Sequence, residues 1–260
     1  MHEARPDGSF CWFELATHDV AAAVSFYGAV FGWGVAGDAL DAPGAFVKWT
    51  VGGHEFGAVY ALEGERPGGV TRHWLPYVRV RDAERMAVRV VELGGRVRFG
   101  PMDAGPFGRM LFLEDPTGAH LGLWQPAQHP GAPSMPPIEG APVWVELATR
   151  DADVARAFHA ALFDWRAKDS GDEVQSYTEF ANDGRPIAGM IVMDERWGGA
   201  PPHWLSYFAV DDCIAAAGRI AAAGGTVCVG PKDVPGVGML AVGIDPQGAP
   251  FALIALGAHG

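Results

Sequence analysis

Residues 12–19, WFELATHD, and residues 144–151, WVELATRD, show that this chain contains the same stretch twice. Further matches at the same phase are Phe26 with Phe158, Phe31 with Phe163, Trp33 with Trp165, HWLPYVRVRD from His73 with HWLSYFAVDD from His203, and DPTGA from Asp115 with DPQGA from Asp245. The period is far longer than the roughly 20 to 50 residues of solenoid repeats. The sequence therefore predicts a duplicated domain, in which a pocket built by one half is built again by the other.

Each half is itself predicted to contain two βαβββ units. In the first unit an alternating segment at 11–17 indicates a strand, and Asp19 is expected to begin a helix because its carboxylate accepts the free amides of a first turn. The other elements expected in the first half are strands around Val35, at 45–52, at 55–62 and at 74–80, a helix from Asp82 to Leu93, and strands near Val97, Met110 and Leu121. A Gly- and Pro-rich break at 64–69 separates the two units. The predicted fold class is α+β.

The repeat predicts two domains, at 1–125 and at 143–260. Between them the segment 126–142 is dense in Pro, Gly and Ala, which is typical of a linker. Because a duplicated chain resembles a fused dimer, we expect either a monomer or a homodimer in solution.

The composition indicates a globular protein that binds neither nucleic acid nor membranes. Hydrophobic residues make up 49% of the chain and charged residues 19%, and no apolar run approaches the ~20 residues of a membrane-spanning helix. The net charge of −12 disfavours contact with phosphate backbones. The first residues lack the basic and apolar regions of a signal peptide, and the three cysteines have no counterparts between the halves, so we expect a cytoplasmic protein.

Three motifs carry a resemblance to a known superfamily: FYGAVFGW at 26–33, ELGG at 92–95 and DPTGAHLGLW at 115–124. With the four βαβββ units, they resemble the vicinal oxygen chelate superfamily, which includes glyoxalase I, bleomycin-resistance proteins and extradiol dioxygenases. The resemblance covers nearly the whole chain and implies two glyoxalase/bleomycin-resistance-like domains. More narrowly, the chain resembles two-domain actinobacterial members, some of which belong to antibiotic pathways. One such scaffold hosts many chemistries, so the resemblance by itself does not give the reaction.

Metal-using members of this superfamily take ligands, usually His or Glu, from the first and last strands of each unit. The positions that the resemblance assigns to these ligands carry Trp12, Leu75 and Gly122 in the first half and Trp144, Leu205 and Ala252 in the second. A remaining position lies within 55–62 and 186–193, where Glu55 is the only carboxylate and Pro186 replaces it in the second half. A divalent cation needs three or four O, N or S donors, which these side chains do not supply. We therefore expect no metal and no other cofactor.

A shifted metal site is the alternative. It would use Glu14, His73 and His120, whose equivalents in the second half are Glu146, His203 and Pro250. Since proline supplies no ligand, the duplicated site would be broken in the second half.

Strand alternation brings every second residue to the same face of a sheet. In the superfamily that this chain resembles, the face with the ligand positions lines a cup. The ligand-binding side chains expected there are Trp12, Glu14, His73, Leu75, Tyr77, His120 and Trp124 in the first half, and Trp144, Glu146, His203, Leu205 and Tyr207 in the second. An aromatic wall with few polar groups suits a planar, drug-sized molecule. The alternative is that Trp12 and Trp144 belong to the core.

Glu14 and Glu146 are the most informative charges, because a carboxylate on the inner face of a sheet is costly unless it is paired. Glu14 either pairs with His73 or Arg109 and fixes its strand, or it acts as a general base. His73 likewise either forms hydrogen bonds at the start of a strand or assists catalysis.

Two functions follow from these observations. The first is metal-independent binding of an aromatic or apolar small molecule, for antibiotic sequestration and resistance or as an accessory in natural-product biosynthesis. The second is a glyoxalase-like lyase or isomerase, in which Glu14 is the base and His73 or His120 orients the substrate or a shifted metal. A further alternative is that one half only supports the other, because the equivalents of His120 and Trp124 are lost in the second half.

Overall fold

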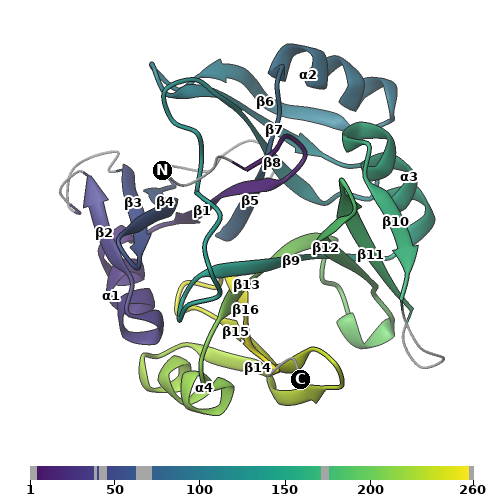
Figure 1. Ribbon diagram of the computed structural model, residues 1–260. Helices are drawn as coiled ribbons and strands as arrows, with labels where there is room; N and C mark the ends of the chain where they lie inside the picture. Colours follow the sequence, from purple (N-terminus) through teal and green to yellow (C-terminus); the bar gives the residue numbers. More distant parts are fainter. Residues whose placement is uncertain (1–4, 38–39, 41–45, 63–71, 171–175, 258–260) are drawn as a thin grey trace. The chain divides into compact units, whose positions relative to one another are not determined.

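The computed structural model describes residues 5–37, 40, 46–62, 72–170 and 176–257, and Figure 1 labels its helices and strands. The elements of the first half are β1 (Phe10–Thr17), α1 (Val20–Phe31), β2 (Gly34–Gly37), β3 (Phe46–Val51), β4 (His54–Ala61), β5 (His73–Arg79), α2 (Ala83–Glu92), β6 (Arg96–Asp103), β7 (Gly108–Glu114) and β8 (His120–Pro126). Those of the second half are β9 (Pro142–Thr149), α3 (Ala152–Phe163), β10 (Arg166–Asp169), β11 (Tyr177–Asn182), β12 (Arg185–Val192), the 3-10 helix η1 (Glu195–Trp197), β13 (His203–Ala209), α4 (Cys213–Ala222), β14 (Thr226–Val234), β15 (Gly238–Ile244) and β16 (Pro250–Leu256). The order βαβββ occurs four times, which confirms the duplicated α+β fold. The predicted break at 64–69 lies outside the described residues.

The strands form two eight-stranded sheets, one from each half of the chain. Their orders are β2-β3-β4-β1-β5-β8-β7-β6 and β10-β11-β12-β9-β13-β16-β15-β14. In every unit the first and last strands are parallel neighbours: β1 pairs with β4, β5 with β8, β9 with β12 and β13 with β16. The four strands with the expected ligand positions are therefore consecutive at the centre of each sheet.

Each of the four α-helices in the described part of the chain begins with an aspartate. The capping carboxylate accepts a backbone amide in each case: Ala22 to Asp19 at 2.9 Å, Arg85 to Asp82 at 3.0 Å, Val154 to Asp151 at 3.1 Å, and Ala215 to Asp212 at 3.0 Å. These bonds satisfy amides that have no partner within the helix. The predicted helix starts at Asp19 and Asp82 are confirmed. No helix within the described residues is long and apolar enough to cross a membrane.

The chain packs into two compact units that each use both halves of the sequence. Unit 1 comprises Met1–Trp12, Leu75–Pro133 and Trp144–Leu205, and unit 2 comprises Phe13–Trp74, Ser134–Val143 and Ser206–Gly260. Helices α2 and α3 are in contact in unit 1, and α1 and α4 are in contact in unit 2. The repeat in the sequence and the units of packing therefore have different boundaries, and the domain limits at 1–125 and 143–260 stay a prediction.

Unit 2 has a continuous aromatic core with residues from both halves of the sequence. The ring of Phe26 on α1 lies 6.0 Å from that of Phe251 on β16, and the ring of Phe31 lies 5.4 Å from that of Phe208 on β13. Aromatic pairs at such distances contribute about 0.5–1.5 kcal/mol beyond the area they bury. The first βαβββ unit is thus stabilised by the fourth.

A buried Asp in each DP-x-G turn joins the two halves of the sequence within one unit. In unit 1, Asp115 accepts a hydrogen bond from Nε2 of His159 on α3 at 3.0 Å, and neither side chain is exposed. In unit 2, Asp245 accepts a hydrogen bond from the hydroxyl of Tyr27 on α1 at 3.1 Å. The turn aspartates therefore have a second function besides shaping the turn, which is to bond a helix from the other half.

The segment predicted as a linker is held by hydrogen bonds in both units. In unit 1 the amide of Ala132 donates to the carbonyl oxygen of Cys11 at 2.6 Å. In unit 2 the amide of Gly140 donates to the carbonyl oxygen of Ala209 at 2.7 Å, and the Gly140 carbonyl accepts from the Trp33 indole at 2.9 Å. The segment is therefore part of both compact units rather than a free tether.

Candidate functional site

The part of the first sheet formed by β5–β8 has two unlike faces. One face carries side chains that are fully buried, and α2 packs against β6, β7 and β8 on this side. The residues of this covered face are Val78, Leu111, Leu113, Leu121 and Leu123. Hydrophobic burial against α2 explains why β7 and β8 are so rich in leucine.

The opposite face carries rings and thioethers. Cross-strand partners share a face, and the register places Tyr77 beside Gly122, Gly122 beside Phe112, and Phe112 beside Phe99. We call this the ring-bearing face, and its members are Tyr77, Phe99, Met102, Met110, Phe112, Gly122 and Trp124. Phe99 is 42% exposed and Met102 is 41% exposed, so two large apolar side chains of this face are open to solvent.

At Gly122 the space of an expected ligand is filled by a neighbouring ring. A Cβ atom built on Gly122 would lie 2.5 Å from the nearest atom of the Tyr77 ring. Tyr77 is only 1% exposed and is fixed by an edge contact with Phe112, whose ring centroid is 5.7 Å away. A His or Glu side chain does not fit at this position without displacing Tyr77.

The residues present therefore do not fit the divalent ion that the superfamily resemblance implies. Trp12 and Leu75 supply no ligand atom at two further positions of the first half. Within the described ranges, no group of three or more His, Cys, Asp or Glu side chains has an arrangement suited to a metal ion.

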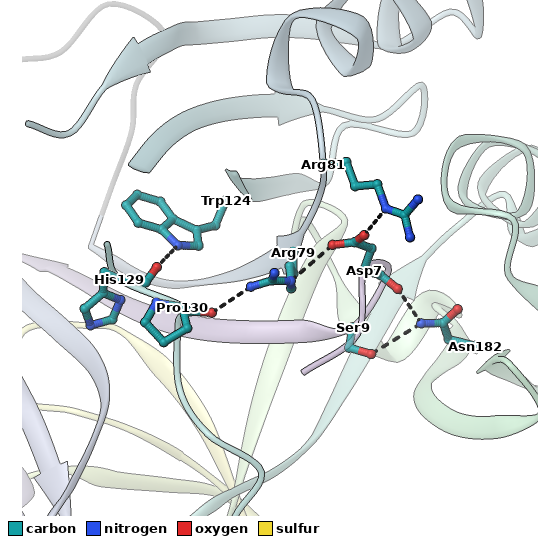
Figure 2. A network of polar contacts seen from close by, with 8 residues as sticks. All are labelled: Asp7, Ser9, Arg79, Arg81, Trp124, His129, Pro130 and Asn182. Carbon is teal, nitrogen blue, oxygen red and sulfur yellow. Dashed lines mark hydrogen bonds and ion pairs between the residues drawn. The ribbon is translucent and has the colours of Figure 1, made fainter. Parts of the chain in front are cut away.

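Two of the predicted stacking surfaces are covered by His129, a residue that the sequence reasoning missed. Its ring makes edge contacts with Trp12, at a centroid distance of 4.8 Å, and with Trp124, at 6.3 Å. The Trp124 indole donates to the carbonyl oxygen of His129 at 3.0 Å, as Figure 2 shows. Trp12 is 7% exposed and Trp124 is 9% exposed, so both indoles are largely shielded.

A network of ion pairs and hydrogen bonds holds the segment 127–131. We call this segment the strap, because its residue His129 covers the Trp12 and Trp124 indoles. Arg79 donates to the carbonyl oxygen of Pro130 at 3.1 Å and to the carboxylate of Asp7 at 3.1 Å. Asp7 also pairs with Arg81, and its carbonyl oxygen accepts from the Asn182 side chain at 2.8 Å (Figure 2). All of these residues belong to unit 1. The start of the chain, β5 and β11 thus jointly position the strap.

His120 lies at the end of β8 with an acidic partner. Its Nε2 atom is 3.3 Å from the carboxylate of Glu114, which also pairs with Arg96 at 2.5 Å. His120 is half-buried and is opposite Glu114 in the register. The imidazole therefore belongs to a local charge cluster at the edge of the ring-bearing face.

Glu14 is buried in unit 2, where it is 5% exposed and opposite Ala58 in the register of β1 and β4. His73 is half-buried at the first position of β5 and belongs to the same unit. Their roles stay predictions. Arg109 forms ion pairs with Glu84 at 2.8 Å and with Asp103 at 2.7 Å.

In the second sheet, the predicted residues Trp144 and Glu146 have different neighbours from their counterparts in the first sheet. Trp144 on β9 donates its indole N–H to the hydroxyl of Tyr177 on β11 at 3.1 Å, and Tyr177 is also hydrogen-bonded to Glu146. Burial, and then the negative charge of Glu146, raise the pKa of the Tyr177 hydroxyl. Tyr177 was missed by the sequence reasoning, although the repeat places Phe46 at its position in the first half.

The remaining predicted residues of the second half line an aliphatic surface or the start of β13. Leu205 and Tyr207 are each 5% exposed, and Tyr207 is paired with Ala252 in the register. His203 is half-buried, and its Nδ1 atom lies 2.9 Å from the carbonyl oxygen of Pro201. The neighbouring strands carry Val229, Leu240 and Val242 where the first half has Phe99, Met110 and Phe112. The second half therefore has an aliphatic counterpart of the ring-bearing face.

This arrangement of units and strands agrees with the comparison to known proteins. Residues 9–123 and 141–253 match the profile of the Glyoxalase/Bleomycin resistance protein/Dioxygenase superfamily. The chain belongs to this superfamily. The family assignment expected from FYGAVFGW and DPTGAHLGLW is thereby confirmed.

Relatives with similar sequences fall into two groups. The chain is 37% identical over 247 residues to the proposed glyoxylase CFP32 of Mycobacterium tuberculosis (strain CDC 1551 / Oshkosh), an alignment that covers 94% of this chain and 93% of that protein. It is 31% identical to the anthracycline biosynthesis protein DauV of Streptomyces sp. (strain C5), with 96% of this chain and 94% of that protein covered. The anthracycline biosynthesis protein DnrV of Streptomyces peucetius is equally similar, at 31% identity over the same shares of the two chains.

Solved structures support the fold alone. The Mn(II)-bound glyoxalase from Novosphingobium aromaticivorans aligns with a TM-score of 0.65 at 14% identity, covering 98% of this chain and 86% of that chain. The 2,3-dioxygenase LapB from Pseudomonas sp. KL28 aligns with a TM-score of 0.62 at 12% identity, covering 97% and 93%. Such low identities carry no information about the reaction.

Proposed function

We propose that this protein binds a planar aromatic or apolar small molecule without a metal, in the context of antibiotic biosynthesis or resistance. The observation that carries the proposal is the ring-bearing face, where Phe99 and Met102 remain exposed beside Phe112. Exposed rings and thioethers on one side of a sheet gain free energy when a flat ligand excludes water from them.

Two further observations support a planar ligand. Gly122 has no side chain and the Tyr77 ring fills the space beside it, so this position of the ring-bearing face holds an aromatic ring rather than a metal ligand. Two relatives are named for the biosynthesis of anthracyclines, compounds whose core is a set of fused planar rings. The proposed ligand class is therefore a fused aromatic polyketide or a compound of similar shape.

Binding of planar compounds to the ring-bearing face tests this function. Calorimetric titration with a panel that includes an anthraquinone and an anthracycline should give saturable binding. Phe112→Ala should raise the Kd for a bound compound about tenfold, because a stacked ring contributes about 1 kcal/mol or more. Val88→Ala, which removes an exposed apolar side chain from α2, is the matched control and should leave the Kd unchanged. Absence of saturable binding across the panel overturns the proposal.

An enzymatic function is the second candidate, and the burial of Glu14 favours it. A carboxylate that is 5% exposed on β1 is positioned away from bulk water, where a general base can be effective. The relative CFP32 is named as a proposed glyoxylase. In this case Glu14→Gln should abolish turnover of a 2-oxoaldehyde and thiol mixture while the melting temperature stays within a few degrees of that of the wild type. Equal rates for the two proteins, or no turnover by the wild type, would remove this candidate.

A further inference from the structure

The second sheet contains a short chain of hydrogen bonds, which we call the polar relay. The Trp144 indole donates to the hydroxyl of Tyr177 at 3.1 Å, and the same hydroxyl is hydrogen-bonded to the carboxylate of Glu146. Since the indole is only a donor and the carboxylate only an acceptor, the hydroxyl must accept from Trp144 and donate to Glu146. The direction of the relay is therefore fixed.

Gly189 on β12 makes room for this relay. It is opposite Glu146 in the register, and a Cβ atom built on it would lie 1.7 Å from the Tyr177 hydroxyl oxygen and 3.1 Å from the indole nitrogen of Trp144. Any side chain at position 189 would displace the hydroxyl. The Tyr177 hydroxyl can therefore occupy its position only because residue 189 is a glycine.

Both residues of this pair differ in the first half. The strand registers match Tyr177 with Phe46, and Gly189 with Ala58. A phenyl ring and a methyl group thus stand where the second half has a hydroxyl and a glycine, although the carboxylate is present in both halves as Glu14 and Glu146. At these two positions the second half supplies the hydroxyl group of the polar relay and the space that it occupies, and the first half supplies neither.

The relay lies on a half-buried surface with apolar neighbours. Trp144, Glu146 and Tyr177 are each of intermediate exposure, and Ile191 is paired with Tyr177 in the register. Because burial and the Glu146 charge raise the pKa of Tyr177, its hydroxyl remains a neutral donor at physiological pH. A carboxylate that is fixed by such a donor and flanked by an indole suits a ligand with a flat ring and a hydrogen-bond donor of its own.

We propose that Trp144, Tyr177 and Glu146 form a ligand-anchoring site in the second half, which recognises the hydroxyl group of a phenol or enol on a planar ligand. The ligand hydroxyl donates to Glu146, and its ring packs against the Trp144 indole. This inference rests on the proposed binding function. It adds that the second half of the chain recognises a hydroxyl group of the ligand.

Matched probes with and without a hydroxyl group test the inference on the full-length protein. The probes are 2-naphthol and 2-methoxynaphthalene, and their Kd values are measured by calorimetry. Wild-type protein should bind 2-naphthol about tenfold more tightly, as expected for a hydrogen bond to a charged group. This preference should disappear in Glu146→Gln and should decrease in Tyr177→Phe. The exposed Glu92 provides the matched control Glu92→Gln, which should retain the preference.

A spectroscopic measurement locates the effect at Trp144. In ¹⁵N-labelled protein, the indole N–H resonance of Trp144, identified from its loss in Trp144→Phe, should shift when 2-naphthol binds, and should shift less at the same concentration of 2-methoxynaphthalene, which is expected to bind about tenfold more weakly. Gly189→Ala, which introduces the first-half residue, should displace the Tyr177 hydroxyl and remove the preference in a protein that still unfolds cooperatively.

The outcomes separate the two proposals. Equal binding of both probes, or a Trp144 resonance that does not respond to 2-naphthol, overturns the anchoring site and leaves planar binding by the ring-bearing face intact. Tighter binding of a cationic probe, naphthalen-2-ylmethylammonium, overturns the assignment of a hydroxyl group. If neither naphthalene binds and the anthraquinone panel also fails to bind, both proposals are overturned.

Discussion

At the scale of single residues, glycines decide what the central strands can hold. Gly122 lets the Tyr77 ring fill a position that the superfamily resemblance assigns to a metal ligand, and Gly189 lets the Tyr177 hydroxyl reach Trp144 and Glu146. In both cases the space is already filled by a neighbouring side chain. Restoring a larger residue is therefore expected to be costly rather than neutral.

Gly122→Ala is predicted to lower the free energy of unfolding by roughly 1–3 kcal/mol, because the new methyl group would overlap the Tyr77 ring. Chemical denaturation monitored by circular dichroism measures the change. Gly218→Ala on α4 is the control, since nothing lies within 4 Å of a Cβ atom there, and a gain of about 0.5–1 kcal/mol is expected. Equal effects of the two substitutions would contradict this account.

The buried Asp115–His159 pair makes stability depend on pH. Burial alone would raise the pKa of Asp115, but the hydrogen bond and charge of His159, with bonds from Thr117 and Ala119, lower it below its ordinary value of 3.8. Because the folded-state pKa is depressed, the contribution of Asp115 to stability is fully present above about pH 4 and is lost as the pH falls further.

Asp115→Asn is accordingly predicted to lower the free energy of unfolding by roughly 2–4 kcal/mol at pH 7. The difference from the wild type should shrink as the pH is lowered below 3.8. Urea unfolding at a series of pH values measures both effects. The exposed Asp233 provides the control Asp233→Asn, for which little change is expected. A difference that stays constant down to pH 2 would refute the linkage.

At the scale of elements, the strap shows how a connecting segment completes a site. It follows β8 directly, and Arg79 on the neighbouring strand β5 binds the Pro130 carbonyl oxygen at 3.1 Å. The strap places His129 against the Trp12 and Trp124 indoles, so these two strand residues are covered by a segment that is not a strand.

Removal of the His129 ring is predicted to expose both indoles. His129→Ala should increase the Stern–Volmer constant for acrylamide quenching of tryptophan fluorescence, and Arg79→Met should have a smaller effect in the same direction by releasing Pro130. Gln128→Ala, at an exposed neighbouring position, should leave quenching unchanged. Unaltered quenching in His129→Ala would show that the strap does not shield these indoles.

At the scale of the whole molecule, the sequence repeat and the packing divide the chain differently. Each compact unit takes one βαβββ unit from each half, as the Phe26–Phe251 and Asp115–His159 contacts illustrate. Neither half of the sequence contains a complete partner for its own helices. The duplication therefore produces a molecule whose halves stabilise each other.

Separate expression of residues 1–133 and 134–260 is predicted to give fragments that do not unfold cooperatively, because the aromatic faces of α1 and α3 would lose their partners. Mixing the two fragments should restore the near-ultraviolet circular dichroism of the intact chain. The measurement is thermal unfolding of each fragment and of the mixture. A sharp transition in either isolated fragment would contradict the prediction.

The sequence by itself determined the fold, because local signals and the repeat agree. The aspartate caps at Asp19 and Asp82 and the alternation from Cys11 to Thr17 predicted elements that the structure contains. The resemblance, which rests on motifs that the sequence displays, placed Trp12, Leu75 and Gly122 at the expected ligand positions. Hydrophobic periodicity and helix capping depend on residues that are close together in the chain, so they can be recognised directly from the sequence.

Only the tertiary structure decided what fills those positions and which surfaces remain open. The Tyr77 ring above Gly122, the His129 cover on Trp12 and the Tyr177 hydroxyl above Gly189 are contacts between segments that the sequence does not relate by spacing. The same holds for the division into interleaved units. Side-chain packing at long sequence separation depends on the volumes and bonding groups that meet in space, and neither periodicity nor the repeat encodes them.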